Sequence, residues 1–199
     1  IQNWPGLKST VITNAYGGIK TEWESSLDEL MLQSASEDGS ISNGASIAFL
    51  FEFEQTKIAF LGDAHPSVCV DGLLKLGYSE ENPCMVDLVK ISHHGSKHNC
   101  TEKLLHILKS KRYLLSTDGR DGRLPDKLTI AKMVKENESV IIYCNYGWWE
   151  RLIYRRFFTE EDKKRWIDTK RLQLIELSTE NAVDNIKNGF ELYGARKTW

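Results

Sequence analysis

The chain has 199 residues, of which 41% are hydrophobic, 10% aromatic and 27% charged, and its formal net charge is -2. These values predict one globular domain over residues 1–199 and exclude a disordered chain, a collagen-like chain and two full catalytic domains. The four cysteines form no C-x-x-C pair, and no apolar run approaches the roughly 18 residues that span a bilayer. We therefore expect reduced thiols, a cytoplasmic location and no membrane partner.

The first part of the chain predicts a helix, a loop and a β-hairpin. Residues 22–33 have the periodicity of an amphipathic helix, and residues 34–44 have the Ser, Gly, Asn and Asp content of a loop. The runs 46–53 and 57–61 are rich in β-forming residues and are separated by three polar residues, which predicts a hairpin. The residues expected to face inward from the helix are Trp23, Leu27, Leu30 and Met31.

Strands and helices alternate in the middle of the chain, which predicts an α/β fold. Asn99 stands three residues before Glu102, so we expect Asn99 to cap the second of these helices. The expected helices are 66–76, 101–109 and 127–135, and the expected strands are 86–92, 112–117 and 140–144.

The last part of the chain is aromatic and basic from Trp148 to Arg171, and a strand at 172–177 and a helix at 182–192 follow. In one interpretation Arg and Lys bind phosphates while the aromatic rings stack on unpaired bases. In the other, which we favour, the rings pack on the core and the charges face water. The pair Trp148-Trp149 is also a candidate anchor for a protein partner.

Two motifs follow predicted strands and carry residues suited to chemistry. His93 and His94 come after the strand 86–92, and Asp63 comes after the strand 57–61. Each has a structural interpretation, since histidines in a Gly-Ser turn can merely cap a loop and Asp after a strand is usually a turn or helix-cap residue. Together they place a carboxylate and an imidazole at one rim of a sheet, a ligand mixture that suits zinc, manganese or iron.

Five segments between residues 43 and 146 resemble a known family. They are NGASI at 43–47, LGDA at 61–64, VDLVKISHHGSKHN at 86–99, YLLSTDG at 113–119 and LPD at 124–126. The chain resembles the metallo-β-lactamase fold superfamily, in the branch that includes the hydrolase domain of the DNA-uptake protein ComEC. The resemblance implies a four-layer αβ/βα sandwich. This chain would be its second half, with residues 147–199 as an aromatic and basic C-terminal extension.

The resemblance also implies a metal-dependent hydrolase. Asp63 and His93 are then the catalytic residues that bind metal, and His94 is the rival of His93 for the last ligand position. The implied cofactor is zinc, with two ions in the complete site, and manganese is the alternative metal. Metal-bound hydroxide would attack a phosphodiester or related ester, so the implied substrates include nucleic acids and nucleotides.

Four further residues have supporting roles in this hypothesis. Ser96 and His98 lie just after the histidine pair and are candidates to contact the substrate. Asn43 and Ser46 resemble the residues that this branch has at the entrance of the hairpin, where they support the metal ligands from behind.

The departures from the family leave two interpretations. The signature His-x-His-x-Asp-His is absent, and Leu124 replaces the histidine of the family's His-Pro segment. Because a catalytic zinc needs three protein ligands, Asp63 and one histidine are not enough, and we expect the chain alone to be a poor hydrolase.

In the first interpretation, which the start at Ile1 favours, the chain is the second half of an enzyme and needs its missing N-terminal half or a partner chain. In the second, which Leu124 favours, it is a catalytically inactive scaffold or regulatory subunit that binds a protein partner. Half a sandwich leaves one sheet face apolar and uncovered, so both interpretations predict a partner for that face.

Overall fold

A β-hairpin forms one side of the central sheet, as the sequence predicts. The computed structural model describes residues 12–13, 19–20, 22–120 and 124–177. Strand β3 (Phe49–Phe53) pairs antiparallel with β4 (Thr56–Phe60), so that Phe49 lies opposite Phe60. Aromatic and β-branched residues favour such half-buried extended segments, which explains why this run forms strands.

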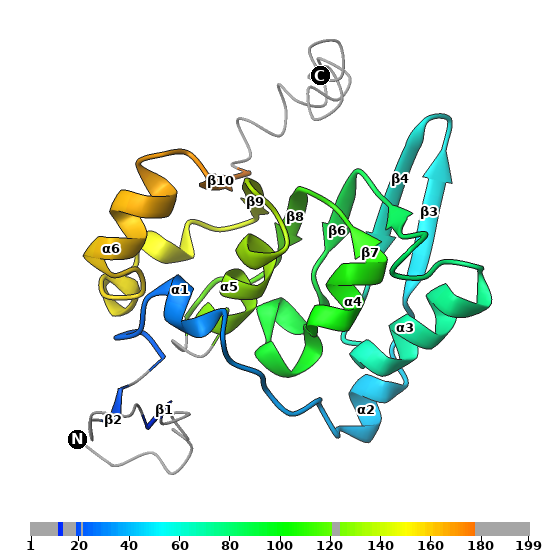
Figure 1. Ribbon diagram of the computed structural model, residues 1–199, viewed down its shortest axis with the longest axis horizontal. Helices are drawn as coiled ribbons and strands as arrows, with labels where there is room; N and C mark the ends of the chain where they lie inside the picture. The colour runs from blue at the N-terminus through cyan, green and yellow to red at the C-terminus, as the bar shows by residue number, and fades with distance from the viewer. Residues whose placement is uncertain (1–11, 14–18, 21, 121–123, 178–199) are drawn as a thin grey trace.

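The later strands add to this hairpin in chain order. They are β6 (Leu88–Lys90), β8 (Arg112–Leu115), β9 (Val140–Cys144) and β10 (Leu172–Glu176). The described sheet has six strands in the order β10-β9-β8-β6-β4-β3, and every pairing from β4 to β10 is parallel (Figure 1). The protein is therefore a mixed α/β protein with a mostly parallel central sheet.

The main helices lie along one side of this sheet (Figure 1). They are α1 (Leu27–Leu30), α3 (Pro66–Lys75), α4 (Glu102–Ile107) and α5 (Lys127–Lys135), and α3 contacts α4 while α1 contacts α5. Each crossover from β4 to β10 moves one strand further in the same direction, and right-handed crossovers in one direction place all their helices on one face. Within the described residues, no helix combines the length and apolar character needed to cross a membrane.

The hydrophobic core lies between the sheet and these helices. Alternate strand residues point toward the helices, and Ala59, Val89, Tyr113 and Ile142 are each at most 1% exposed. Their neighbours along the strands point to the opposite face of the sheet.

No helix of the described residues covers that opposite face, which we call the open face. Phe51 and Phe53 on it are 46% and 62% exposed, in contrast to the buried residues of the covered face. The register of the strands places the following side chains on the open face: Phe49, Phe51, Phe53, Thr56, Ile58, Phe60, Leu88, Lys90, Arg112, Leu114, Ile141, Tyr143, Gln173 and Ile175.

Shorter elements complete the described structure, and the helix expected at 182–192 lies outside the described residues. Two small sheets are formed by β1 (Ile12–Thr13) with β2 (Ile19–Lys20) and by β5 (Cys84–Met85) with β7 (Leu108–Lys109). Two short helices are α2 (Ile41–Gly44) and α6 (Glu160–Asp162). The remaining elements are the 3-10 turns Ser92–Gly95, Lys97–Asn99, Trp148–Glu150 and Leu152–Tyr154 and the π-helical turn Lys163–Ile167.

Two sequence predictions about helix starts are wrong. The helix expected at 22–33 is only α1, because Ser26 accepts a hydrogen bond from Glu29 N while the Glu29 carboxylate accepts one from Ser26 N, and this reciprocal cap starts the helix late. Helix α4 is capped by Thr101, not by Asn99. The amide of Asn99 instead contacts Asp38, Asp63 and His93.

The aromatic and basic segment belongs to the core. Trp148 and Phe157 are 0% exposed, their ring centroids lie 5.0 Å apart, and β10 is a strand of the main sheet. The favoured interpretation, in which the rings pack on the core, is confirmed for this part of the segment. Trp148 is therefore not exposed as an anchor for a partner, and residues 147–177 are not an appended extension.

A buried ion pair fastens α1, α5 and α6 together. Lys127 and Asp162 are both 0% exposed, and Lys127 Nζ lies 2.6 Å from Asp162 Oδ2. Lys127 Nζ also donates to the carbonyl of Ser25, and Asp162 Oδ1 accepts the backbone N–H of Leu27, each at 2.6 Å. Three segments of the chain thus meet at one pair of charges.

The four cysteines are buried and form no disulfide. Burial raises the pKa of the Cys69 and Cys100 thiols to about 11 and that of Cys144 to about 12. Thiols with such raised pKa values stay protonated and unreactive at neutral pH.

Candidate functional site

The parallel strands all end at one rim of the sheet, and candidate residues follow them directly. Asp63 comes after β4, His93 after β6, Ser116 after β8 and Asn145 after β9. His93 N donates to the carbonyl of Gly62 at 3.0 Å, which joins the first two of these loops. In α/β proteins ligands bind in the crevice beyond the carboxyl ends of the strands, so this rim is the candidate site.

The histidine pair adopts a backbone conformation that is rare for side chains with a Cβ. The φ angle is 43° at His93 and 54° at His94, and Gly95 continues the turn at 84°. Position 95 requires glycine, because a Cβ there would lie 2.7 Å from Leu115 Cδ1 and 2.9 Å from Pro125 Cβ. Left-handed residues cost about 1–2 kcal/mol each and persist only where the surrounding structure enforces them, which is common at functional sites.

His93 is the end of a hydrogen-bonded chain of side chains that begins at Asp38. Asn99, which is 1% exposed, donates from Nδ2 to the Asp38 carboxylate at 3.0 Å and to the carbonyl of Asp63 at 3.2 Å. Its Oδ1 must then act as the acceptor, and it lies 3.1 Å from His93 Nδ1. In the neutral imidazole this assigns the proton to Nδ1 and leaves a lone pair on Nε2. An imidazole in this state is ready to bind a metal or to accept a proton.

Asn43 supports Asp38 from the other side. Its Nδ2 donates to Asp38 Oδ2 at 2.7 Å and also lies 3.3 Å from His93 Nδ1. Because Nδ1 carries a proton when it donates to Asn99, the hydrogen bond of the Asn43 amide goes to Asp38. Asn43 thus contacts His93 through a carboxylate that the sequence analysis did not single out, and its support of a metal ligand stays a prediction.

The Asp38 carboxylate is strongly stabilised in its charged form. The hydrogen bond from Asn43 is the largest cause that lowers its pKa from 3.8 to about 2, and Ser40 N, Asn99 and the charge of His65 act in the same direction against the effect of burial. Asp38 Oδ2 lies 3.7 Å from His93 Nδ1. A permanent negative charge therefore faces the protonated nitrogen of the His93 ring.

Replacing Asp38 by Asn should lower the free energy of unfolding by about 2 kcal/mol at pH 7, the equivalent of its pKa shift. A group whose pKa is lowered on folding stabilises the protein above its unfolded pKa, here 3.8, and loses that contribution as the pH falls through about 2. Urea unfolding of both proteins at pH 7 and near pH 2 measures this. The difference between them should vanish at the lower pH, and an unchanged difference would contradict the ionic origin.

His94 lies beside His93 and faces a groove. Its Nδ1 contacts the carbonyl oxygen of Ser116, which can only accept, so Nδ1 donates and the neutral ring keeps the lone pair of Nε2. The rings of His93 and His94 lie 6.1 Å apart. The groove has a volume of about 500 Å³ and is lined by His94, Ser116, Thr117, Asp118, Gly119, Arg120, Leu124, Asn145 and Tyr146.

Asp63 is half-buried and held by its backbone. Its N–H donates to the hydroxyl of Ser46 at 3.2 Å, and support of a metal ligand by Ser46 stays a prediction. Gly62 before it adopts φ 55°, where a Cβ would lie 2.9 Å from the Ile47 carbonyl. The Asp63 charge acts on Lys90, whose pKa burial lowers and Asp63 raises. The Asp63 carboxylate is therefore near the end of β6.

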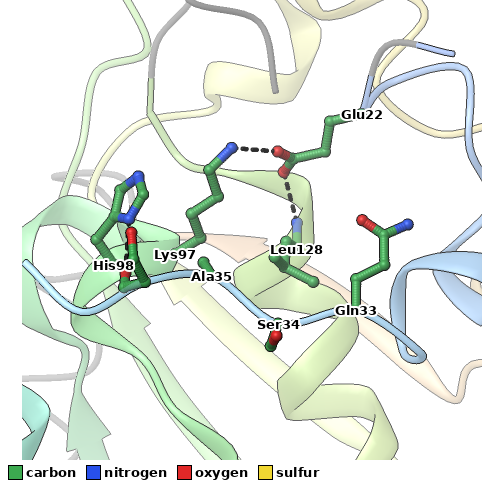
Figure 2. Close-up of a pocket in the computed structure, with 8 residues that line it drawn as sticks. Glu22, Gln33, Ser34, Ala35, Lys97, His98 and Leu128 are labelled. Atoms are coloured by element: carbon green, nitrogen blue, oxygen red, sulfur yellow. Dashed lines mark hydrogen bonds and ion pairs between the residues drawn. The ribbon is translucent and has the colours of Figure 1, made fainter. Parts of the chain in front are cut away.

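The structure does not bring Ser96 and His98 to the groove that His94 lines. Ser96 is 5% exposed and its hydroxyl accepts the N–H of His98 at 3.3 Å, while His98 Nδ1 bonds the carbonyl of Ser36 at 2.8 Å. His98 lines a separate cavity of about 220 Å³ (Figure 2). There Lys97 pairs with Glu22 at 2.8 Å. Contact of Ser96 or His98 with a substrate remains a prediction.

The rim fits a metal in the type of its ligands but not in their number. Asp63, His93 and His94 are ligands that zinc and manganese accept. In the part of the chain that the structure describes, no three His, Cys, Asp or Glu side chains lie close enough together to hold a metal ion. A complete centre needs ligands beyond those that this rim brings together.

Sequence reasoning missed Asp38 and misjudged Asn99. Asp38 lies in a loop of Ser, Gly and acidic residues with no strand before it, so nothing local distinguished it. The spacing to Glu102 predicts a helix cap at Asn99, although its place six residues after His93 is the signal that points to the histidine. The contact between Asn99 and Asp38 spans 61 residues of sequence, which only the fold reveals.

Comparisons with protein-family models, with curated proteins and with solved structures found no match to this chain. The fold and the rim define the class of this chain. It is an α/β protein whose mostly parallel sheet places a carboxylate and two imidazoles after adjacent strands.

Proposed function

We propose that this chain forms one half of a metal-dependent hydrolase of the metallo-β-lactamase fold, which cleaves a phosphodiester or related ester in nucleic acids or nucleotides. The observation that supports it best is the chain from Asp38 through Asn99 to His93, which leaves Nε2 of His93 unprotonated at the rim. Metal-binding histidines characteristically donate their other nitrogen in this way. The site lies where β4 and β6 end, at the edge that such a sheet offers to ligands.

Each rim residue has a defined task in this proposal. His93 and Asp63 bind zinc or manganese, and His94 binds metal or takes a proton at its Nε2. Asp38, through Asn99, keeps the proton of His93 on Nδ1. When bound, the metal supplies Lewis acidity for ester cleavage. The remaining ligands of a two-ion site must come from the other half.

A zinc titration of the full chain tests this proposal. We expect weak binding of Zn²⁺ by the wild type and at least about tenfold weaker binding by His93→Ala, because loss of a ligand should cost no less than loss of its hydrogen-bond partner. Competition with a chromophoric chelator measures both constants. His106→Ala is the matched control, because His106 on α4 is bonded to Glu136, away from the rim.

Two outcomes would contradict the proposal. One is a wild type that binds no zinc, and the other is equal binding by wild type and His93→Ala. Hydrolysis of bis(4-nitrophenyl) phosphate with excess Mn²⁺ or Zn²⁺ gives a second reading. The rate should be low for the chain alone and lower still for Asp63→Ala, since the chain provides part of the ligand set only.

The alternative is a catalytically inactive scaffold or regulatory subunit that binds a protein partner. The open face favours it, because ten apolar side chains lie on that face without a covering layer among the described residues. Leu124 at the position of the family's histidine is consistent with it. Absence of zinc binding in the titration above would select this alternative.

A further inference from the structure

The groove beside His94 is framed by hydrogen bonds between the loops that follow β8 and β9. Asn145 Oδ1 accepts the N–H of Thr117 at 3.1 Å, and Asn145 Nδ2 donates to the Ser116 hydroxyl at 3.2 Å. The carbonyl of Ser116 in turn accepts the proton of His94 Nδ1. The volume of the groove is about 500 Å³, within the roughly 300–1,000 Å³ of small-molecule sites. The groove is therefore a preformed site of the size of a ligand.

An exposed aromatic ring lines the groove. Tyr146 is 51% exposed there, whereas Trp148, two residues further along the chain, is 0% exposed in the core. Leu124 adds an apolar side chain to the same lining. A flat ring that is exposed in a groove is a platform for stacking, and every nucleobase has the planar face that such a platform binds. This part of the groove therefore suits a planar heterocycle.

A charged pair also lines the groove. Arg120 Nε lies 3.2 Å from Asp118 Oδ2, and the Arg120 side chain is 78% exposed. The backbone N–H of Arg120 is the largest cause that lowers the pKa of Asp118, and the charges of Arg120 and Arg151 act in the same direction. Asp118 is therefore a carboxylate at neutral pH, and two guanidinium groups lie near it.

Gly119 fixes the place of this charged pair. Its φ angle is 62°, and a Cβ there would lie 2.8 Å from both Trp148 Cβ and Tyr154 Cε2. Only glycine allows the loop to lie so close to these buried rings. The side chains of Asp118 and Arg120, on either side of Gly119, are thereby held at the groove by the aromatic part of the core.

We propose that this groove is a nucleotide-binding site, in which the base stacks on Tyr146 and the phosphate binds Arg120. The guanidinium group presents a fork of N–H donors that matches the geometry of a phosphate. Asp118 beside it accepts hydrogen bonds from ribose hydroxyls, as acidic residues do in dinucleotide-binding folds. Because ribose joins the base to the phosphate, a nucleotide uses all three side chains together. A sugar phosphate leaves Tyr146 unused, and a nucleoside leaves Arg120 unused.

The nucleotide site deepens the proposed function, and its place in catalysis rests on that function. His94 lines the same groove, so a nucleotide bound there lies beside the candidate metal ligands. The groove is then the part of the site that recognises the substrate. Stacking and phosphate binding need no metal, so nucleotide binding is measurable apart from the metal chemistry.

Binding of 5′-AMP to the full chain in the presence of EDTA tests the proposal, with isothermal titration calorimetry as the measurement. Tyr146→Ala should weaken binding at least about fivefold, the lower end of what base–aromatic stacking contributes. Tyr146→Phe keeps the ring and should bind within about twofold of the wild type. Ribose 5-phosphate, which has no base, should bind more weakly than 5′-AMP and should not respond to Tyr146→Ala.

A second variant tests the phosphate contact. Arg120→Ala should weaken the binding of 5′-AMP at least about tenfold and leave that of adenosine unchanged, because adenosine has no phosphate. The control Lys103→Ala removes one positive charge from an exposed position outside the groove and should change neither affinity. Circular dichroism melting checks that each variant folds.

Three outcomes overturn the nucleotide site. They are a wild type that binds no 5′-AMP, equal binding of 5′-AMP by the wild type and Tyr146→Ala, and an equal loss of 5′-AMP and adenosine binding in Arg120→Ala. Nucleotide binding by a chain that binds no zinc keeps the groove and refutes the hydrolase, whereas zinc binding without nucleotide binding does the reverse.

A single-stranded RNA hexamer of adenosine distinguishes the two sources of a nucleotide. Tighter binding of the hexamer than of 5′-AMP, with the same loss in Tyr146→Ala, assigns the groove to nucleic-acid strands. Tighter binding of 5′-AMP assigns it to free nucleotides. Hexamer binding that neither Tyr146→Ala nor Arg120→Ala weakens takes place outside the groove and contradicts its assignment to strands.

Discussion

Replacing Asp162 by Ala is expected to lower the free energy of unfolding by about 3–5 kcal/mol, the usual cost of removing one partner of a buried ion pair. Lys127 and Asp162 are both 0% exposed and 2.6 Å apart, so the substitution leaves an ammonium group in the core without its counter-charge. It also removes the acceptors of the backbone N–H groups of Leu27 and Thr159. Urea unfolding followed by circular dichroism measures the loss.

The pH dependence of this variant separates the charge from the lost hydrogen bonds. Burial lowers the pKa of Lys127 and Asp162 opposes that effect, so removing Asp162 lowers the pKa of the lysine further. The unfolded chain then binds more protons than the folded one, and stability rises with pH as the folded lysine deprotonates. We expect the difference from the wild type to be largest at acidic to neutral pH and smaller at alkaline pH.

The double variant Lys127→Met/Asp162→Leu is the control. Removing both charges leaves no unpaired ion in the core, so it should be more stable than Asp162→Ala despite the lost bond to Ser25. Equal stability of the single and double variants would contradict the electrostatic explanation. A loss below about 1 kcal/mol in the single variant would contradict the importance of the pair itself.

Local periodicity predicted the regular elements where the chain forms them from neighbouring residues. The helix expected at 127–135 and the strand at 140–144 have the bounds of α5 and β9, and the hairpin and α3 differ from expectation by only a few residues. These segments have strong apolar patterns, and burial of one face against the sheet preserves them. The α/β class followed from their alternation alone.

Polar contacts between residues far apart in sequence explain why local patterns did not predict some features of the fold. The Ser26-x-x-Glu29 cap that starts α1 at Leu27 is a local signal, whereas nothing in residues 22–33 shows that the Asp162 carboxylate accepts the N–H of Leu27 across 135 residues. The apolar pattern of Trp148 to Trp166 was clear, but whether its rings faced core or solvent depended on the helices and strands they meet.

The candidate site shows the same difference between what local sequence patterns predict and what contacts between distant residues determine. The positions of Asp63 and His93 followed from the ends of adjacent strands, because parallel strands bring such ends together. The state of the His93 ring did not, since it depends on Asn99 and on Asp38, 61 residues before Asn99 in the sequence. Sequence motifs therefore indicated the candidate residues, and the fold supplied the groups that hydrogen-bond to His93.

Replacing Asn99 by Ala is expected to weaken zinc binding by about 10–100-fold, the range found when a partner of a metal-binding histidine is removed. The variant breaks the connection between Asp38 and His93 and leaves the carbonyl of Asp63 without this donor. We expect a further loss of about 1–3 kcal/mol in the free energy of unfolding, because polar groups around a side chain that is 1% exposed lose their partner. Chelator competition and urea unfolding measure the two effects.

The nitrogen chemical shifts of His93 distinguish a positioning role of Asn99 from a merely structural one. In the metal-free wild type at neutral to alkaline pH they should show the proton on Nδ1, and in Asn99→Ala a mixture of both tautomers should appear, because no amide oxygen then selects Nδ1. The control Asn82→Ala removes an amide from an exposed turn and should leave the tautomer, the zinc affinity and, to within about 0.5 kcal/mol, the stability unchanged.

If Asn99→Ala keeps the Nδ1 tautomer, Asn99 does not set the state of His93. If the tautomer changes while zinc binding stays the same, His93 is not the metal ligand, and the hydrolase proposal fails at its central residue.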